Sequence, residues 1–371
     1  MSKQLTSIGL MSGTSLDGID VSIIQSDGEE KIEIIGNYYL SYEEKFKKDL
    51  GELKNKIINK ADLDINKDII QKIESNLTDL HADSITNILR KYNLTSKDID
   101  VVGFHGQTIY HSYKENISRQ LGEGKKLNKL INISVIYNFR ENDILNGGQG
   151  APLTPIYHKA LQKIHNLSLP LAFINIGGIA NITYIDESKK ITAFDSGPGN
   201  CLIDNFLQLK SNNKINFDNN GEIALKGSIN EIILENYLND PFYLLPPPKT
   251  LDVGDFSLSI IRGLNLEESV TTLSELTART IGDSLNFFAN KPRKLFLSGG
   301  GRKNKFLFKR IEELSNIETK NIDDLNVDGD YIESQSFAYL AIRSLLNKPI
   351  SYPETTGVNK PCLGGVLIKT K

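Results

Sequence analysis

The sequence is poor in cysteine, with only Cys201 and Cys362 among its 371 residues. Two cysteines cannot crosslink a chain of this length, and neither belongs to a Cys-x-x-Cys pair that would indicate zinc or redox chemistry. No window approaches the roughly 18 uninterrupted apolar residues of a membrane span, and the first residues lack a basic segment followed by a long apolar run. We therefore expect a cytoplasmic protein in a reducing compartment, without a signal peptide or membrane contact.

The sequence also lacks a strong net charge. Its 43 basic and 46 acidic residues give a formal charge of −3. Such a balance offers no large positive field, which argues against nucleic acid as a partner. Small anionic ligands remain compatible with it, because backbone N–H groups can bind them without net charge. With 39% hydrophobic and 24% charged residues, the composition is that of a globular protein, and the length suits two domains.

A similar order of predicted elements occurs twice along the chain. Each half begins with three strands around a glycine-rich first turn and then alternates helices and strands. In the first half we expect strands at 7–11, 19–25, 31–42, 100–104 and 131–137, and helices at 42–60, 65–92 and 155–165. In the second half we expect strands at 171–176, 180–185, 191–194 and 294–297, and a helix at 305–314.

This duplication predicts two similar α/β domains, 1–168 and 169–371, with a cleft between them where ligands bind. The last helix and the tail could pack back on the first domain. Residues 122–129, rich in glycine and lysine, are expected to form a solvated loop. Residues 239–256 contain three consecutive prolines and are expected to form an extended excursion.

The first glycine-rich turn reads Met-Ser-Gly-Thr-Ser-Leu-Asp-Gly-Ile-Asp. Gly13 would let the backbone approach a ligand, and Thr14 and Ser15 would add hydroxyl donors, so the hairpin can offer several N–H groups to a polyphosphate. It is not a P-loop, because no Gly-Lys-Ser/Thr closes it. Asp17 or Asp20 could hold Mg²⁺ through water. A plain hairpin with an Asp-Gly turn explains the same residues equally well.

Two further glycine-rich turns follow predicted strands. Gly177 and Gly178 occupy the corresponding place in the second half, and Gly299, Gly300 and Gly301 follow a strand and open a helix. The three consecutive glycines suit close approach by a flat base or a ribose, and the start of a helix favours anions. Each run alone is more often a tight turn, but three at corresponding strand ends favour a nucleotide site.

Asp195 ends the third predicted strand of the second half, where a strand would deliver its last side chain into a cleft. A carboxylate there can orient and deprotonate a hydroxyl or a water molecule. Equally, Asp195 or Ser196 could cap the helix that begins near Asn200, which is common for these residue types.

Polar residues that could contact a sugar lie in three other segments. If the chain is extended after the predicted strand at 100–104, His105, Gln107 and His111 share a face, and sugar binding is favoured over zinc because no third ligand is evident. Arg140 could clamp a carboxylate, or it could belong to a solvated charged turn. Glu333 precedes a helix, where an acid is more often explained by the helix dipole.

Taken together, these segments closely resemble the anhydro-N-acetylmuramic acid kinase family over nearly the whole chain. The combination is specific although no single segment is. The resemblance is carried by residues 11–20, 105–108, 147–152, 175–183, 194–200, 297–304, 333–341 and 355–357.

The resemblance implies the two-domain actin-like (ribonuclease H-like) ATPase fold, with ATP and Mg²⁺ as cofactors. It implies transfer of the γ-phosphoryl group of ATP to the 6-oxygen of 1,6-anhydro-N-acetylmuramic acid, with hydrolytic opening of the anhydro bridge. The product would be N-acetylmuramic acid 6-phosphate, an intermediate of cell-wall recycling. The sugar and ATP are then the small-molecule partners, and we expect a homodimer.

The family's functional residues transfer to matching positions of this sequence. The catalytic aspartate corresponds to Asp195. The nucleotide loop corresponds to Gly13, Thr14, Ser15, Leu16, Asp17, Gly18, Ile19 and Asp20. We expect the sugar to contact His105, Gln107, Arg140, Asp143 and Glu333.

The chain departs from the family pattern at two places. Relatives usually carry Pro-Pro-Lys-Ser-Thr where this chain has Pro-Pro-Lys-Thr-Leu at 247–251, and small apolar residues where it has Ser334 and Ser336. We expect neither departure to touch the chemistry, although the first could alter dimer packing or loop closure.

Two rival functions are compatible with parts of this pattern. Another sugar or carboxylate kinase of the same fold would share the phosphate turns but lack the 194–200 arrangement. A nucleotide-gated binding protein would need a separate peptide-binding domain, for which the chain has no room.

Overall fold

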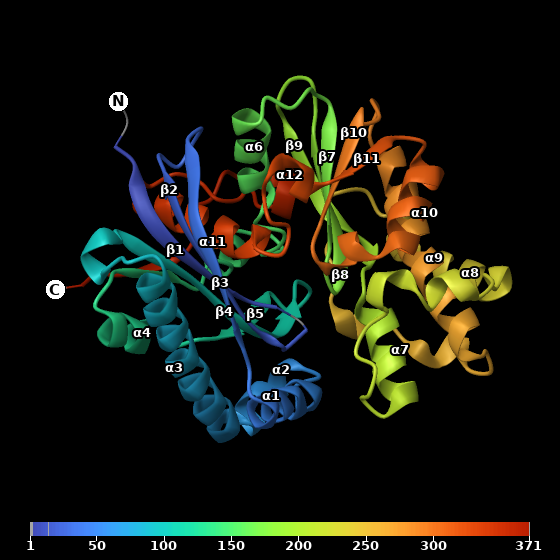
Figure 1. Ribbon diagram of the computed structural model, residues 1–371, viewed down its shortest axis with the longest axis horizontal. Helices are drawn as coiled ribbons and strands as arrows, with labels where there is room; N and C mark the ends of the chain where they lie inside the picture. Colours follow the sequence, from blue (N-terminus) through green and yellow to red (C-terminus); the bar gives the residue numbers. More distant parts are fainter. Residues whose placement is uncertain (1–2, 14, 371) are drawn as a thin grey trace. The chain divides into compact units, whose positions relative to one another are not determined.

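The computed structural model describes residues 3–13 and 15–370. The described residues form two compact units, coloured along the sequence in Figure 1. Unit 1 comprises Met1–Asn166 and Tyr331–Lys371, and unit 2 comprises Leu167–Asp330. The chain passes from unit 1 to unit 2 after Asn166 and returns at Tyr331, so its last long helix and its tail lie in unit 1.

Unit 1 is built on one mixed sheet. Among its described residues, seven strands pair in the order β12-β6-β4-β1-β2-β3, with β5 added to β4. Neighbours β1, β2 and β3 are antiparallel, whereas β1, β4 and β6 are parallel. The strands are β1 (Leu5–Ser12), β2 (Gly18–Ser26), β3 (Ile32–Ser41), β4 (Val101–Ser112), β5 (Ile117–Leu121), β6 (Val135–Tyr137) and β12 (Val366–Ile368).

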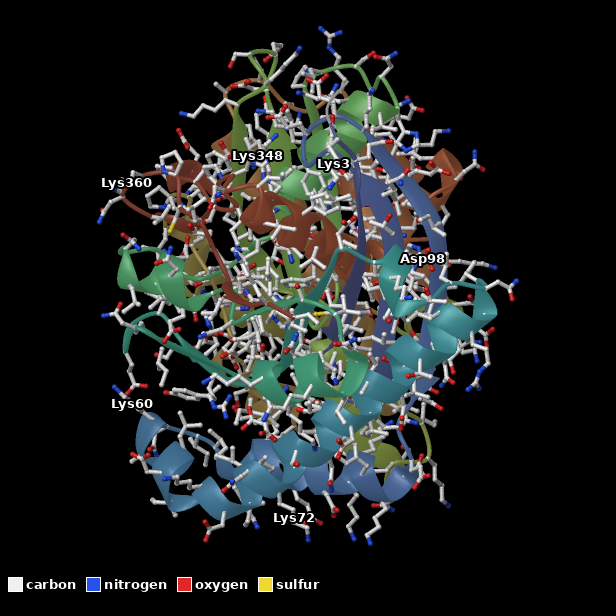
Figure 2. All side chains as sticks on the ribbon, turned by 90° about the vertical axis from the view of Figure 1, so that its left-hand side faces the viewer. Lys3, Lys60, Lys72, Asp98, Lys348 and Lys360 are labelled. Carbon is white, nitrogen blue, oxygen red and sulfur yellow. The ribbon has the colours of Figure 1, made fainter. Side chains whose placement is uncertain are left out.

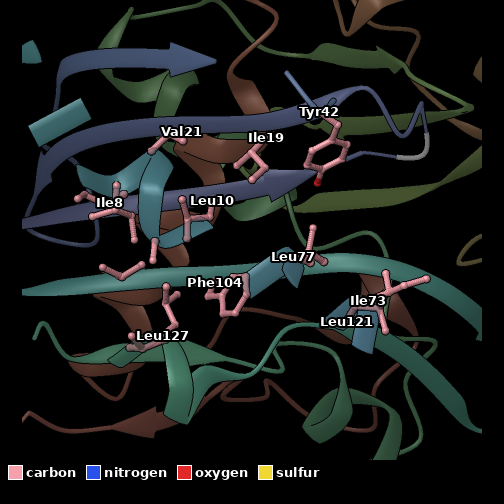
Figure 3. Close-up of a cluster of buried hydrophobic side chains, with 14 of the residues drawn as sticks. Ile8, Leu10, Ile19, Val21, Tyr42, Ile73, Leu77, Phe104, Leu121 and Leu127 are labelled. Carbon is pink, nitrogen blue, oxygen red and sulfur yellow. The ribbon is translucent and has the colours of Figure 1, made fainter. Parts of the chain in front are cut away.

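One face of this sheet carries the main hydrophobic core of unit 1. Figure 3 shows Ile8 and Leu10 of β1 and Phe104 of β4 among the clustered side chains, together with Leu77 from a helix. The helices of unit 1 are α1 (Glu44–Lys56), α2 (Lys60–Ile65), α3 (Lys67–Lys91), α4 (Gly124–Ile131), α5 (Glu141–Leu145), α6 (Pro155–Ile164), α11 (Ile332–Leu345) and α12 (Pro353–Thr356).

Helix α11 packs against β1, β2 and β4 through small residues of the sheet. A Cβ at Gly9 would lie 1.8 Å from the carbonyl oxygen of Ser334, and one at Gly103 would lie 2.2 Å from that of Phe337. Glycine at these positions is what lets the helix backbone lie directly on the strands. Ser334 also exchanges a 2.7 Å hydrogen bond with Ser22 of β2, so a serine at this departure from the family pattern has its own partner.

Unit 2 repeats the central strand order of unit 1. Its described sheet has the order β11-β10-β7-β8-β9, with β7, β8 and β9 antiparallel and β7, β10 and β11 parallel. The strands are β7 (Leu171–Ile176), β8 (Ile179–Ile185), β9 (Ile191–Pro198), β10 (Lys294–Ser298) and β11 (Glu318–Asn321). The longer helices are α7 (Cys201–Ser211), α8 (Glu231–Leu238), α9 (Leu266–Ser284) and α10 (Lys305–Ser315). In both units, the first of three antiparallel strands also pairs in parallel with a later strand, which pairs in parallel with one more. This order confirms the predicted α/β class and its ribonuclease H-like topology.

Several predicted elements differ from the structure. Residues 122–129 were expected to form a solvated loop, but they contain most of α4, whose Leu127 is fully buried. The lysines that suggested a loop occupy the outer side of an amphipathic helix. Strand β9 continues to Pro198 rather than ending at 194, so Asp195 lies inside the strand. The predicted helix at 65–92 is confirmed as α3, whereas the predicted helix at 42–60 ends at Lys56 and is followed by the short helix α2.

Charged side chains cover the outer surface. The labelled Lys60 and Lys72 of unit 1 lie on its surface in Figure 2, and Asp98 is also exposed. Within the described part of the chain, no helix combines the length and apolar character needed to cross a bilayer. Cys201 and Cys362 are both buried and unbridged.

A buried polar chain links α3 to the end of β1. Nδ1 of His81 donates to the carbonyl of Leu77 at 2.8 Å, because a carbonyl can only accept. Nε2 of His81 is then the acceptor for the Ser12 hydroxyl at 2.9 Å, and Ser12 in turn accepts from the Tyr42 hydroxyl at 3.1 Å. Burial lowers the pKa of His81 to about 4, so the ring is neutral at pH 7.

We expect His81 to make the protein acid-sensitive. The unfolded chain would bind this proton near pH 6.5, whereas the folded chain resists it until about pH 4, so stability is full above pH 6.5 and is lost as the pH falls toward 4. Between pH 7 and pH 4.5 this one group should remove on the order of 2 kcal/mol from the free energy of unfolding. Urea unfolding at both pH values should therefore give a smaller acid loss for His81→Gln than for the wild type. An equal acid loss in the two proteins would contradict the assignment.

Candidate active site

The turn between β1 and β2 is hydrogen-bonded to the side chain of Gln107 in β4. Nε2 of Gln107 donates to the carbonyl of Gly13 at 3.0 Å, and the side chain is almost completely buried. Among the described residues, Oε1 of Gln107 has no hydrogen-bond partner. A buried acceptor in this position indicates that a donor from a ligand or water belongs beside the turn.

The turn itself is a strained, hydroxyl-rich segment. Leu16 has a φ of 56°, which is unusual for a residue with a branched side chain. The hydroxyl of Ser15 donates to Oδ1 of Asp17 at 2.6 Å, and the carbonyl of Asp17 accepts from the Tyr42 amide at 2.9 Å. Thr14, which the sequence also assigned to the nucleotide, lies outside the described residues. The side chain of Ile19 is fully buried in the core of unit 1.

His105 and Arg140 form a pair at the end of the parallel strands of unit 1. Nε and Nη2 of Arg140 lie 3.2 and 2.9 Å from Nε2 of His105, and Nη1 of Arg140 donates to the carbonyl of Gly150 at 2.7 Å. Burial first, and then the charge of Arg140, hold the pKa of His105 well below its usual value. His105 is thus a neutral ring that donates from Nδ1 to the carbonyl of Gly106. The alternative of a solvated turn for Arg140 is wrong.

Asp143 lies beneath the glycine-rich loop at 147–150. Its Oδ1 accepts from the Gly150 amide at 2.7 Å, and its Oδ2 accepts from the hydroxyl of Thr356 at 2.6 Å. The residue is 1% exposed. In this structure the carboxylate holds the loop in shape and is not presented at a surface.

Glu333 and His111 lie within electrostatic reach of Arg140. Burial raises the pKa of Glu333 above its usual value, and the charge of Arg140 opposes part of this rise. Burial, followed by the charge of Arg140, lowers the pKa of His111 to about 4. Glu333 is also in the first turn of α11, so its place agrees with the helix-dipole explanation as well.

In unit 2, Asp195 is a buried carboxylate, 6% exposed, within β9. Its backbone amide donates to the carbonyl of Lys249 at 2.9 Å, and its Oδ2 accepts from the amide of Leu251 at 2.9 Å. The capping alternative is wrong, because the N-cap of α7 is Asn200 and the hydroxyl of Ser196 donates to the carbonyl of Ala180.

The segment that holds Asp195 belongs to the long excursion after α8. We expected the family departure at 247–251 to leave the chemistry untouched, yet this segment lies directly against Asp195. The contact uses the backbone N–H of Leu251, which any residue except proline provides, so replacing threonine by leucine preserves it. The sequence gives no signal for this pairing, since β9 and the loop are more than fifty residues apart.

The glycine-rich turns of unit 2 meet at one edge of its sheet, because β7 and β10 are parallel neighbours. A Cβ at Gly299 would lie 2.4 Å from the side chain of Asn175, and one at Gly301 would lie 2.2 Å from that of Ile176. The carbonyls of Gly177 and Gly178 accept hydrogen bonds from the backbone that follows β9.

The helix after the third turn begins at the predicted residue, preceded by a short 3₁₀ turn. Gly300–Lys303 forms a 3₁₀ turn, and α10 begins at Lys305 with Asn304 as its N-cap. The side chain of Asn304 accepts from the amides of Phe306 and Leu307, which satisfies the donors that an anion would use. The amides of Phe306 and Leu307 are thus bonded to the cap of α10 itself, and the three glycines precede that helix.

Comparison with known proteins shows the family of this chain. The family model described as anhydro-N-acetylmuramic acid kinase matches residues 5–370. An anhydro-N-acetylmuramic acid kinase of Pelagibacter ubique is 45% identical over 379 residues, covering 100% of both chains. One of Methylorubrum extorquens is 40% identical over 371 residues, covering 97% of this chain and 98% of its own. Among solved structures, component A of (R)-2-hydroxyglutaryl-CoA dehydratase from Acidaminococcus fermentans has a TM-score of 0.47 at 11% identity, covering 92% of this chain and 99% of that one.

The strand order shared by the two units is that of the actin-like ATPase fold, and the family match makes the chain an ATP-using kinase of this fold. More particularly, the chain belongs to the anhydro-N-acetylmuramic acid kinase family. It is an ATP-dependent enzyme that converts 1,6-anhydro-N-acetylmuramic acid to N-acetylmuramic acid 6-phosphate in cell-wall recycling.

The loop above Asp143 provides a stability test. In Gly148→Ala, the new Cβ would lie 2.0 Å from Oδ1 of Asp143, and that carboxylate cannot move without losing its partners. We expect a loss of about 1–3 kcal/mol in urea unfolding. Gly254→Ala is the matched control, because its Cβ would meet nothing closer than 3.6 Å. Equal stability of the two variants would contradict this description of the loop.

Proposed function

We propose that Asp195 is the general base of this reaction and that the turn between β1 and β2 binds the phosphates of ATP. The observation that carries the first assignment is the geometry of Asp195, a buried carboxylate whose backbone amide and Oδ2 are both hydrogen-bonded to one loop segment. A general base needs a fixed orientation toward the proton that it removes.

The reaction then proceeds with one proton passing to Asp195. A water molecule gives this proton to the carboxylate as its oxygen forms a bond to the anomeric carbon. The bond between that carbon and the bridging 6-oxygen breaks, and the electron pair stays on the 6-oxygen. This oxygen attacks the γ-phosphorus of ATP, and the bond from phosphorus to the leaving ADP breaks. Asp195 later releases its proton to solvent.

The glycines divide into those that the fold requires and those that it does not. A Cβ at Gly18, Gly299 or Gly301 would lie within 2.4 Å of another atom. At Gly13, Gly177 and Gly300 the nearest atom would lie 3.7 to 4.0 Å away. Because no protein atom fills the space beside these three glycines, we propose that the nucleotide occupies it. This division supports nucleotide contact at each of the three turns.

Asp17 and Asp20 fit a magnesium site that keeps its waters. Burial first, and then the charges of Asp17 and Asp20, raise the pKa of the Tyr39 hydroxyl, so both carboxylates lie near that side chain. Among the described residues, no group of three or more histidine, cysteine or carboxylate side chains could hold a metal. Magnesium prefers few carboxylates and several waters, so a pair of aspartates suits it. Bound there, Mg²⁺ would neutralise charge on the transferring phosphoryl group.

For the sugar, we propose contacts from His105, Gln107, Arg140 and Glu333. The neutral His105 suits hydroxyl and amide groups, as does Oε1 of Gln107, which has no hydrogen-bond partner in the described part of the chain. The cationic Arg140 suits the lactyl carboxylate. We propose that Asp143 acts indirectly, by holding the loop to which Arg140 is bonded.

We further propose that units 1 and 2 correspond to the two functional domains, and that the enzyme is a cytoplasmic homodimer. The near-zero net charge and the low cysteine content support the cytoplasmic assignment.

Asp195→Asn tests the assignment of the general base. The variant should fold and bind ATP nearly normally, because an amide oxygen can still accept from Leu251. Its turnover should fall at least about a thousandfold, which corresponds to about 4 kcal/mol of barrier. Steady-state ADP release and ATP titration measure the two effects. Near-normal turnover, or loss of ATP binding alone, would count against the proposal.

Gly300→Ala tests the nucleotide assignment. Stability should change by less than about 0.5 kcal/mol, since the nearest atom to the new Cβ is 4.0 Å away. The dissociation constant for ATP should rise about tenfold, a loss of about 1.4 kcal/mol in binding. Gly301→Ala should instead lower stability, because its Cβ would lie 2.2 Å from Ile176. Unchanged ATP affinity in Gly300→Ala would remove this turn from the site.

A further inference from the structure

Lys249 is a nearly buried lysine, 4% exposed, in the loop that pairs with Asp195. Lysine is rarely buried in proteins unless its ammonium group is partnered. Here Nζ donates to the carbonyls of Phe242 and Tyr243 at 3.0 and 3.2 Å. Burial lowers its pKa to about 8, so the group is still mostly cationic at pH 7.

The same ammonium group lies among aromatic rings from different parts of unit 2. Nζ is 4.6 Å from the ring centres of Phe242 and Phe287, and 5.8 Å from that of Phe194. Phe287 follows α9, Phe242 belongs to the loop, and Phe194 directly precedes Asp195 in β9. Cation–π contacts of a desolvated ammonium group are stronger than exposed ones. Lys249 thus joins the loop, the end of α9 and the catalytic strand.

The backbone around Lys249 makes both contacts to Asp195 described above. Its own carbonyl accepts from the Asp195 amide, and the amide two residues later donates to Oδ2 of Asp195. The side chain fixes the position of this short segment, and the segment fixes the carboxylate. Without the ammonium group, the loop would lose its cation–π contacts with Phe194 and Phe287. It would also lose the two hydrogen bonds from Nζ to its own carbonyls.

We infer that Lys249 is a positioning residue for catalysis, which acts through the 249–251 segment to hold the carboxylate of Asp195 in its reactive orientation. This inference rests on the proposed role of Asp195 as general base. It assigns Lys249 no contact with either substrate. Loss of Lys249 should therefore lower turnover without weakening ATP binding.

The test is a double-mutant cycle between Lys249→Met and Asp195→Asn. Lys249→Met should lower kcat about 10- to 100-fold, the usual effect of removing a group that orients a catalytic one. The KM for ATP should change less than about threefold. In the Asp195→Asn background the same change should have almost no further effect on the residual rate, because the group that it positions is already absent.

The controls separate positioning from loss of structure. Lys210→Met removes a lysine that lies 5.7 Å from the ring of Phe206 on the exposed side of α7, and it should leave kcat unchanged. Phe287→Leu keeps the cation but removes one of the rings around it, so it should lower kcat by less than Lys249→Met does. It replaces Lys249→Met as the test variant if Lys249→Met does not fold.

The outcomes distinguish the two claims. An equal fractional loss in both backgrounds, or full activity of Lys249→Met, would overturn the positioning role while leaving Asp195 as the base. Near-normal turnover of Asp195→Asn alone would overturn the base assignment itself. If only Phe287→Leu folds, a kcat equal to that of the wild type would overturn the role of the cation site.

Discussion

The hydrogen bond from the Leu251 amide to Asp195 is the contact on which the proposed chemistry depends. It joins a regular strand to a loop that lacks regular structure over much of its length. A carboxylate within a strand is held by its backbone, but its side chain can still rotate about its own bonds. The donated N–H, together with the backbone pairing at Lys249, restricts that rotation.

The same principle recurs in unit 1, where buried polar groups hold the turn and the neighbouring loop in shape. Gln107 bonds the carbonyl of Gly13, and the His81–Ser12–Tyr42 chain fixes the end of β1 just before the turn. Asp143 does the equivalent for the loop that Arg140 contacts. In each case a buried polar group stabilises a segment that we propose contacts a ligand. Such support reduces the reorganisation needed at the moment of reaction.

Most of the fold could be predicted from the sequence, because its strands are short apolar runs bounded by glycine and polar turns. The repeated strand order followed from the two glycine-rich first turns. The helix α4 was missed because its sequence is rich in lysine and only Gly124 and Leu127 of it are buried. The end of β9 was missed because Gly197 and Pro198 normally end strands, whereas here Gly197 is needed where Thr280 of α9 approaches within 2.5 Å of a Cβ position.

The candidate site was only partly predictable. His105 and Arg140 were found as separate polar residues, and the structure joins them directly. The role of Lys249 could not be found, because its partners are carbonyl groups and rings distant in the sequence. The substitution of leucine for threonine at 251 seemed remote from the chemistry for the same reason. Contacts made by backbone groups do not depend on which side chains are present, so they cannot be inferred from the sequence.

The most direct test of the account is turnover in ¹⁸O-labelled water with Mg-ATP and 1,6-anhydro-N-acetylmuramic acid. If Asp195 activates water at the anomeric carbon, each ADP released should accompany one labelled oxygen on that carbon of the sugar phosphate and none in the phosphoryl group. A phosphorylated sugar with its bridge intact, or label in the phosphoryl group, would contradict it.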